Sequence, residues 1–439
     1  MPANKDIGAL QRALIDAPVP VSRGCVRTTL GSIVKAELPG SLPGSLVLVE
    51  GKGEKRVAAE VISRDGVLAD LALLAGDIFT PSPRDSVRVV QLAPQVPCGW
   101  GLLGRAVDPL GVPVDGGLGI VDVLPWPLNR AAPEPLSRLP ITDQMVTGVR
   151  ALDGCLALGV GQRVGLFAGP GLGKSSLIGT LVERAMSEVI VVCLVGERGR
   201  EAGEFLRRFL ESSSRNRSVV VVSTADAPPQ NRVRALDTAT AVAEWFRLQG
   251  RNVLLLVDSL TRVVRARREV AFALGEQPVR GGFPASAFAS LPGLLERTGR
   301  AATGSITAIY TVLIEGDDDP LAEEARSLLD GHIVLSEKLA RLGHWPAIDI
   351  LSSVSRTMES VVSDDVARAA ARLRRLVAAY REHEDLILMG AYRRGTCRDT
   401  DEALSRKVAI DTFLRQAQDE TSSLSQTHKA LMAFAKNGE

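Results

Sequence analysis

The chain has 439 residues, and at ~150 residues per domain this length predicts about three domains. Hydrophobic residues make up 45% and charged residues 23% of the chain, a composition that excludes a disordered protein. The 52 Lys and Arg residues balance 51 Asp and Glu residues, so the formal net charge is +1. This balance gives no overall attraction to nucleic acid or to an anionic membrane, although it does not exclude a local patch.

The five cysteines lie far apart and include no CxxC pair. Their odd number and wide spacing argue against a disulfide framework or a zinc site and fit a reducing cytoplasm. No uncharged apolar run approaches the ~18 residues that span a bilayer, and the charged N-terminus has no apolar core of a secretory signal. We therefore expect a cytoplasmic protein that reaches a membrane only through its partners.

Three kinds of sequence precede the centre of the chain. Residues 1–21 have the spacing of a short amphipathic, helical N-terminal arm. Residues 22–95 contain short β-branched runs separated by Gly, Pro and Asp, which predicts a small β-barrel or sandwich. Residues 96–145 are rich in Pro and Gly, and this density predicts an extended, turn-rich connector that wraps the next domain.

Residues 146–360 alternate between apolar runs and helical segments, which predicts a doubly wound α/β domain. The runs are apolar nearly throughout, as in parallel strands buried on both faces. They lie at 164–168, 189–195, 219–223, 253–258 and 305–314. Residues 361–439 have amphipathic helical spacing, so the chain is expected to end in a helical domain.

A glycine-rich loop follows the first of these apolar runs. The text AGPGLGKS at 168–175 fits the P-loop pattern GxxxxGK[ST], except that Ala168 replaces the first glycine. Glycines let backbone N–H groups surround phosphate oxygens, and the helix that follows adds a partial positive charge. Lys174 would hold the β- and γ-phosphates of ATP, and Ser175 would bind Mg²⁺. The predicted nucleotide-binding residues here are Gly169, Pro170, Gly171, Leu172, Gly173, Lys174, Ser175 and Ser176.

Two acidic residues at strand ends are candidates for the rest of the site. The run 253–258 ends at Asp258, the position where P-loop proteins hold Mg²⁺. The run 189–195 is followed by Glu197, which could polarise an attacking water. A helix start or a pair with Arg198 explains Glu197 equally well from its chemistry alone.

At this point the motifs resemble one family, the type III secretion ATPases of flagellar export and injectisomes, which are related to the catalytic subunits of rotary ATP synthases. The resemblance rests on AGPGLGKSS, VGERGREAGEF, VLLLVDSLTR, GSITAIYTVLIEGDD, LLDGHIVLS and HWPAIDILSSVSR, which occur in family order. It covers residues 22–400, and the first 21 residues match poorly. The resemblance implies an N-terminal β-barrel, a RecA-like P-loop ATPase domain and a C-terminal helical domain.

The same resemblance implies roles for four further side chains. Glu197 in GERGRE is similar to the catalytic glutamate, with Arg198 near the phosphates or at a subunit contact. Arg356 in SSVSR resembles the arginine finger that enters the neighbouring subunit's ATP site and stabilises charge during phosphoryl transfer, although a surface salt bridge would explain an arginine as well. Trp345 replaces the usual Tyr associated with adenine stacking, with a core aromatic as the alternative.

Two residues depart from the family's text. The family commonly reads P-x-x-R-G-Y-P, whereas PVRGGFP at 278–284 has Gly281 in place of the arginine and Phe283 in place of Tyr. The resemblance puts this loop at the subunit interface or the pore. What the change does to coupling between subunits stays open.

The resemblance also implies an assembly and its partners. A finger supplied by a neighbour requires a ring, so we expect a homohexamer that hydrolyses ATP with Mg²⁺. Expected partners are a central stalk protein, a stator or peripheral regulator, effector–chaperone complexes and an inner-membrane export gate, reached peripherally at its cytoplasmic face. TGVRALDGCL and RGGFPASAF favour an injectisome over a flagellar system.

A basic stretch in the helical C-terminus has two interpretations. It is a candidate surface for cargo chaperones, but a charge run of this kind is more often simply a solvated helix face. Its residues are Arg368, Arg372, Arg374 and Arg375.

Other classes of protein compete with this interpretation. A rotary ATP synthase catalytic subunit shares the sites but requires a partner chain to form its ring. A hexameric RNA helicase would need aromatic and basic residues in its N-terminal domain, yet residues 22–95 have one aromatic, Phe79, and no dense basic patch. The intact Lys174, Ser175, Glu197 and Asp258 argue against an inactive scaffold, and no nucleic-acid partner is expected.

Overall fold

The computed structural model describes residues 22–435, apart from 53–54, 76–79, 315 and 317–318. The predicted N-terminal arm at 1–21 and Phe79 therefore lie outside the described residues. The chain divides into two compact units, residues 1–94 and 95–439. Among the helices that the structure describes, none is long and apolar enough to cross a membrane.

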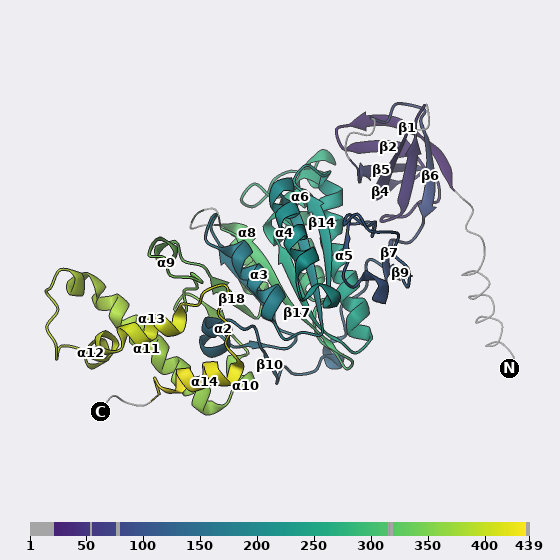
Figure 1. The fold of residues 1–439 in the computed structure, drawn as a ribbon. Helices are drawn as coiled ribbons and strands as arrows, with labels where there is room; N and C mark the ends of the chain where they lie inside the picture. Colours follow the sequence, from purple (N-terminus) through teal and green to yellow (C-terminus); the bar gives the residue numbers. More distant parts are fainter. Residues whose placement is uncertain (1–21, 53–54, 76–79, 315, 317–318, 436–439) are drawn as a thin grey trace, which may run out of the picture. The chain divides into compact units, whose positions relative to one another are not determined.

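The first unit is a closed antiparallel barrel with strand order β1-β2-β5-β4-β3-β6 (Figure 1). Its strands are β1 (Arg23–Leu30), β2 (Ile33–Glu37), β3 (Leu46–Glu50), β4 (Arg56–Asp65), β5 (Leu68–Leu73) and β6 (Ser86–Gln91). Alternate residues such as Val47 and Val49 point into an apolar interior, as the period of two along a strand requires. The predicted barrel is confirmed.

The second unit is built on a nine-stranded sheet. Eight of its strands follow one another in the order β19-β18-β12-β17-β15-β13-β14-β8, and β16 pairs with β17. The strands are β8 (Ala106–Val107), β12 (Arg163–Ala168), β13 (Val189–Glu197), β14 (Ser218–Thr224), β15 (Asn252–Asp258), β16 (Gly299–Arg300), β17 (Ser305–Leu313), β18 (Gly331–Val334) and β19 (Val354–Ser355). β8, β12–β15, β17 and β18 pair in parallel, which confirms the five predicted apolar strands.

Helices cover both faces of this sheet (Figure 1). On β13, Ile190, Val192 and Leu194 join a core with α3 and α4, whereas Val191 and Cys193 join a second core with α5–α8. These helices are α3 (Lys174–Arg184), α4 (Gly199–Glu211), α5 (Pro229–Leu248), α6 (Leu260–Ala273), α7 (Ala285–Leu295) and α8 (Pro320–Leu328). A strand buried on both faces explains why the sequence showed unbroken apolar runs.

The Pro- and Gly-rich segment contains more regular structure than its composition suggests. β8 joins the sheet beside β14, and β7 (Gln95–Cys98) pairs with β9 (Leu124–Pro127). Short elements complete it: η1 (Trp100–Leu102), η2 (Pro135–Ser137) and β10 (Gln144–Met145), which pairs with β11 (Leu158–Gly159). Tertiary pairing with β14 makes a strand of a two-residue segment that has no strand signal of its own.

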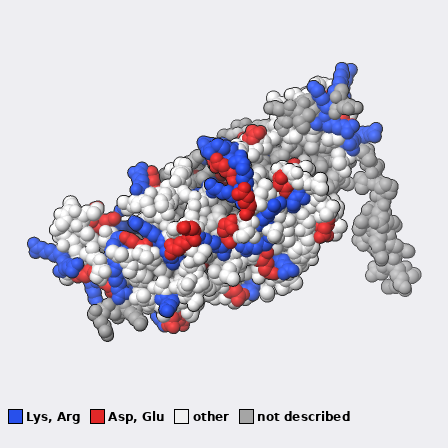
Figure 2. All heavy atoms as spheres, viewed as in Figure 1, with Lys and Arg blue, Asp and Glu red and all other residues white. Residues whose placement is uncertain are grey.

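The C-terminal part is helical, as predicted. Its helices pack with α2 (Arg150–Cys155), and both share one continuous core with α3 and α4. They are α10 (Met358–Val361), α11 (Asp364–Leu388), α12 (Arg398–Ser405), α13 (Lys407–Leu414) and α14 (Leu424–Met432), preceded by the short α9 (Glu337–Arg341). In the view of Figure 2, basic and acidic side chains are scattered among uncharged ones.

Candidate nucleotide site

The P-loop joins the end of β12 to the start of α3. Gly171 and Gly173 have φ values of +74° and +80°, in the left-handed region that favours glycine. Gly173 precedes the first turn of α3, whose free N–H groups and partial positive charge face the loop. The local sequence therefore supplies the glycines and the helix N-terminus of an anion-binding turn.

Lys174 joins the two predicted carboxylates. Its ammonium group binds Asp258 and lies 3.4 Å from Oε1 of Glu197. All three side chains are largely buried. β13 and β15 are parallel neighbours with Leu194 opposite Asp258, so their carboxyl ends bring both acids to the loop. The structure thus assembles Lys174, Glu197 and Asp258 from three separate segments.

Sequence reasoning missed Arg262, which also binds Glu197. It comes from the first turn of α6, and its stem packs against Gly196, where a Cβ would lie 2.9 Å from the Cδ of Arg262. Burial acts to raise the pKa of Glu197, but the Arg262 hydrogen bond and the charges of Lys174 and Arg262 outweigh it and lower the pKa. The available signal was its place four residues after Asp258 in VDSLTR.

Sequence reasoning also missed Thr311, a buried residue near the end of β17. Its hydroxyl donates to Oδ1 of Asp258 at 2.9 Å. Helix α6, which follows Asp258 in the chain, is also joined to β17, because the backbone N–H of Leu313 donates to Thr261 Oγ1 at 2.8 Å. These bonds join Asp258 and the start of α6 to β17. Such contacts depend on strand order and could not be read from the sequence.

The oxygen ligands that Mg²⁺ prefers lie together beside the loop. Ser175, Glu197 and Asp258 line one cavity of about 440 Å³, and the carboxylates already hold the cation of Lys174. No group of three or more His, Cys, Asp or Glu side chains with metal-binding geometry exists among the described residues. The set therefore fits Mg²⁺ completed by nucleotide phosphates and water, which is the usual mode of binding for this ion.

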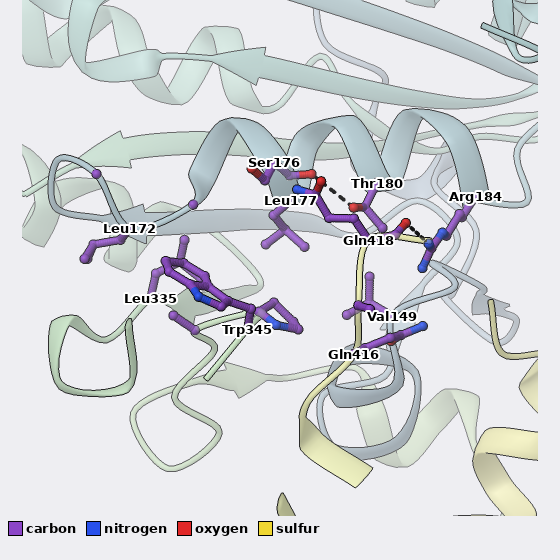
Figure 3. A pocket seen from close by; sticks show the side chains of 15 residues that line it. Val149, Leu172, Ser176, Leu177, Thr180, Arg184, Leu335, Trp345, Gln416 and Gln418 are labelled. Carbon is purple, nitrogen blue, oxygen red and sulfur yellow. Dashed lines mark hydrogen bonds between the residues drawn. The ribbon is translucent and has the colours of Figure 1, made fainter. Parts of the chain in front are cut away.

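A second cavity of about 640 Å³ extends from the other side of the loop. Trp345 lines it with Leu172 and Leu335, and its indole packs so closely on Gly173 that a Cβ there would lie 2.7 Å from Cζ3 (Figure 3). Trp345 is 41% exposed. Gln416 and Gln418, from the segment between α13 and α14, complete the cavity and carry no motif that sequence reasoning could have used.

The two remaining predicted arginines lie away from Lys174. Arg198 is 81% exposed and pairs with Glu201 at 3.5 Å. Arg356 follows β19, and its backbone N–H donates to Asp330 O at 3.1 Å, just before β18 begins. β18 runs parallel to β12, so Arg356 lies at the amino edge of the sheet and the P-loop lies at the carboxyl edge.

The register of β18 on β12 gives the distance along the strand between Arg356 and the P-loop. Leu335 N donates to Phe167 O, so Leu335 is level with the start of the loop. Asp330 is five residues earlier, which at ~3.3 Å per residue is about 16 Å along the strand. This is farther than an arginine side chain extends. The exposed Arg356 side chain has no hydrogen-bond or ion-pair partner among the described residues.

The two loop residues that differ from the family's usual sequence pack against other residues of this chain. Gly281 has a φ of +56°, and a Cβ there would lie 2.5 Å from Cγ of Pro320. Phe283 is buried under the guanidinium of Arg268, 4.8 Å from its ring centre.

The strand, glycine loop, helix and convergent carboxylates define a P-loop nucleotide-binding domain of the ATP synthase alpha/beta family, whose nucleotide-binding domain model matches residues 148–355. A second model, of the type III secretion EscN ATPase C-terminal domain, matches residues 362–433. The chain belongs to the family of type III secretion and flagellar export ATPases, and it is an ATPase of protein export.

Relatives match nearly the whole chain. The SPI-2 type 3 secretion system ATPase of Salmonella typhimurium is 46% identical over 417 residues, covering 94% of this chain and 95% of the relative. The flagellum-specific ATP synthase of Bacillus subtilis is 41% identical, covering 95% and 96%. The structure of the assembled ATPase EscN from the enteropathogenic E. coli type III secretion system aligns with a TM-score of 0.87 at 41% identity, covering 94% of this chain and all of that one.

Proposed function

We propose that this chain is the ATP-hydrolysing motor of an injectisome, which releases and unfolds chaperone-bound effectors and energises their export. It works at the cytoplasmic face of the inner membrane, next to the export gate. The support is the match to secretion-system ATPases at 46% and 45% identity and to the EscN C-terminal domain. That domain distinguishes export ATPases from the general nucleotide-binding fold.

In this proposal the loop and the residues around it each have one role in binding ATP. Backbone N–H groups of residues 171–173 and the ammonium of Lys174 bind the β- and γ-phosphates. Ser175 and Asp258 hold Mg²⁺, which when bound neutralises phosphate charge. Trp345 stacks on the adenine from the 640 Å³ cavity, where an exposed indole face meets the end of the loop.

Glu197 acts on water in the hydrolytic step. Its carboxylate lies beside Lys174, which binds the phosphates in this proposal, and it accepts a proton from the water that attacks the γ-phosphorus. The bond between the γ-phosphorus and the bridging oxygen breaks, and ADP and phosphate leave. In this proposal a neighbouring subunit supplies a further cation that stabilises the developing charge.

The position of Arg356 carries the proposal of a ring. Its side chain is exposed and has no hydrogen-bond or ion-pair partner among the described residues, and it lies at the edge of the sheet opposite its own P-loop. A neighbour that presents its carboxyl edge to this amino edge receives the finger. Such a contact is heterologous and closes into a ring, which we propose to be a homohexamer with six equivalent sites.

Partners attach to this ring in the proposal. The solved complex of EscN with its central stalk EscO aligns with this chain at a TM-score of 0.86, which supports a central stalk protein here. A peripheral regulator and effector–chaperone complexes are the further partners. Arg198 on the exposed start of α4 is available for a subunit contact.

Measuring ATP hydrolysis of the purified chain over a range of protein concentrations tests whether activity requires the ring. Hydrolysis per subunit is expected to rise steeply with protein concentration as each finger meets a neighbour's site. Rates per subunit that do not change with concentration, in a chain that stays monomeric, would refute the proposal. Activity of the chain by itself separates it from a rotary subunit that needs a partner chain.

A flagellar export ATPase is the second candidate. It is favoured by matches to flagellum-specific ATP synthases of Bacillus subtilis and Pseudomonas aeruginosa at 41% and 43% identity. Complementation decides between them. The injectisome proposal expects restored effector secretion, and no restored motility, in strains that lack the respective ATPase. A pull-down with a stalk protein and an effector chaperone from each system provides the matching binding data.

A further inference from the structure

The turn at 349–353 leads directly into β19, and Arg356 follows that strand. Oδ1 of Asp349 accepts from the backbone N–H of Leu351 at 3.0 Å and of Ser352 at 3.3 Å. Ser353 Oγ donates to Asp349 O at 2.6 Å and accepts from Val334 N at 2.9 Å. The turn is thereby closed on itself and joined to β18, and β19 begins at the next residue.

Two arginines of α11 bind this turn from the C-terminal side. Both NH groups of Arg374 donate to the carbonyl of Ser353 at 3.2 Å. Arg381 donates to both oxygens of Asp349, at 3.0 and 3.2 Å. The two arginines are seven residues apart, which is close to two helical turns, so they lie on the same face of α11. A guanidinium that makes two charge-assisted bonds fixes orientation as well as distance.

Burial strengthens these contacts. Asp349 is 7% exposed, and although burial acts to raise its pKa, the hydrogen bond and charge of Arg381 outweigh it and lower the pKa. Arg374 is half-buried and lines, together with Arg356 and three alanines of α11, a cavity of about 620 Å³. The finger and the arginine that holds its turn therefore open onto one space at the amino edge of the sheet.

The other arginines of the basic stretch behave differently. Arg368 pairs with Asp365, and Arg375 pairs with Asp399 at 2.9 Å. Arg372 binds Asp399 and Glu402 of α12. These pairs all stay within the C-terminal helices. Of these four arginines, only Arg374 reaches the turn at 349–353, because its position on α11 faces the sheet.

We infer that Arg374 and Arg381 are positioning residues for Arg356, through which helix α11 sets the place of the finger in the neighbouring subunit's site. The inference rests on the proposed finger role. It gives the C-terminal helices a physical route to the catalytic step: a shift of α11 moves the turn at 349–353, and the turn moves β19. Cargo that binds these helices would then change turnover without touching ATP.

Arg374→Gln in the full-length, assembled chain tests this, with Arg375→Gln as the matched control. We expect kcat to fall about tenfold in Arg374→Gln, since a displaced catalytic group loses rate steeply with small shifts. The KM for ATP should change less than twofold because the nucleotide cavity is untouched. Arg375→Gln removes the same charge from the next position and should keep kcat within twofold.

A double variant distinguishes positioning from a general structural role. If Arg374 acts through the finger, Arg356→Ala with Arg374→Gln is no slower than Arg356→Ala alone. Multiplied losses in the double variant, or an equal loss in Arg375→Gln, would overturn the inference. Full turnover in Arg356→Ala would instead refute the finger, and with it the proposed function, before Arg374 is considered.

Conservative variants cover the case in which Arg374→Gln does not fold. Arg374→Lys and Arg381→Lys keep the positive charge but lose the two-pronged geometry. Both are expected to fold, to bind ATP normally and to lose several-fold in kcat. Wild-type kcat in both lysine variants would overturn the inference, because positive charge alone would then suffice.

Discussion

The two edges of the central sheet differ in whether their charged side chains find partners within the same chain. At the carboxyl edge, Lys174, Glu197, Asp258 and Arg262 bind one another and are partly or fully buried. At the amino edge, the side chain of Arg356 is exposed and has no hydrogen-bond or ion-pair partner among the described residues. One edge is a site whose charges are satisfied within the chain. The other presents a single cation outward, as expected of a group that works in a neighbour's site.

Removal of Arg356 tests the exposed edge most strongly. Arg356→Ala should lower kcat by about 10³-fold, the smaller end of what arginine fingers contribute, and leave ATP affinity nearly intact. Steady-state turnover and fluorescent-nucleotide binding on the assembled ring measure the two quantities. Undiminished hydrolysis would remove the distinction between the edges. Arg368→Ala, a surface arginine paired with Asp365, is the control.

Glu197→Gln tests the buried edge. The amide keeps the shape of the side chain but cannot accept the proton from water, so turnover should fall by about 10²-fold or more. Bound ATP should then stay unhydrolysed. Quenching the reaction and measuring the ATP and ADP bound to the ring detects this. Rapid product release from this variant would contradict the assignment of Glu197 as the base.

A mixture of the two variants sharpens the comparison. When rings assemble at random from an equal mixture of the two chains, a site with intact Glu197 meets a neighbour with intact Arg356 at about a quarter of the interfaces. Hydrolysis should recover toward this fraction. A mixture no more active than its parts would place the finger and the base in the same chain's site.

Trp345→Ala should have the smallest effect of the four. Loss of stacking on the base, worth about 1–3 kcal/mol, should raise the KM for ATP about tenfold and leave kcat within threefold. Trp345→Tyr should restore the KM, because a phenol also stacks. A KM unchanged in Trp345→Ala would assign the indole to packing on Gly173 alone.

Much of this protein was readable from local patterns. Unbroken apolar runs predicted five strands of the sheet because parallel strands are buried on both faces, and β-branched runs predicted the barrel. The P-loop was readable because Gly171 and Gly173 need a backbone freedom that only glycine supplies at no cost. The strands β8 and β19 were not readable, since two residues carry no period.

The sequence by itself determined the elements, the anion-binding loop and the presence of acids at strand ends, all of which follow from residues close together in the chain. Only the tertiary structure decided which of these meet. Arg262 reaches Glu197, Thr311 reaches Asp258 and Arg374 reaches Ser353 because of strand order and helix direction. Such contacts join residues many positions apart, and no local pattern encodes the register that brings them within hydrogen-bond distance.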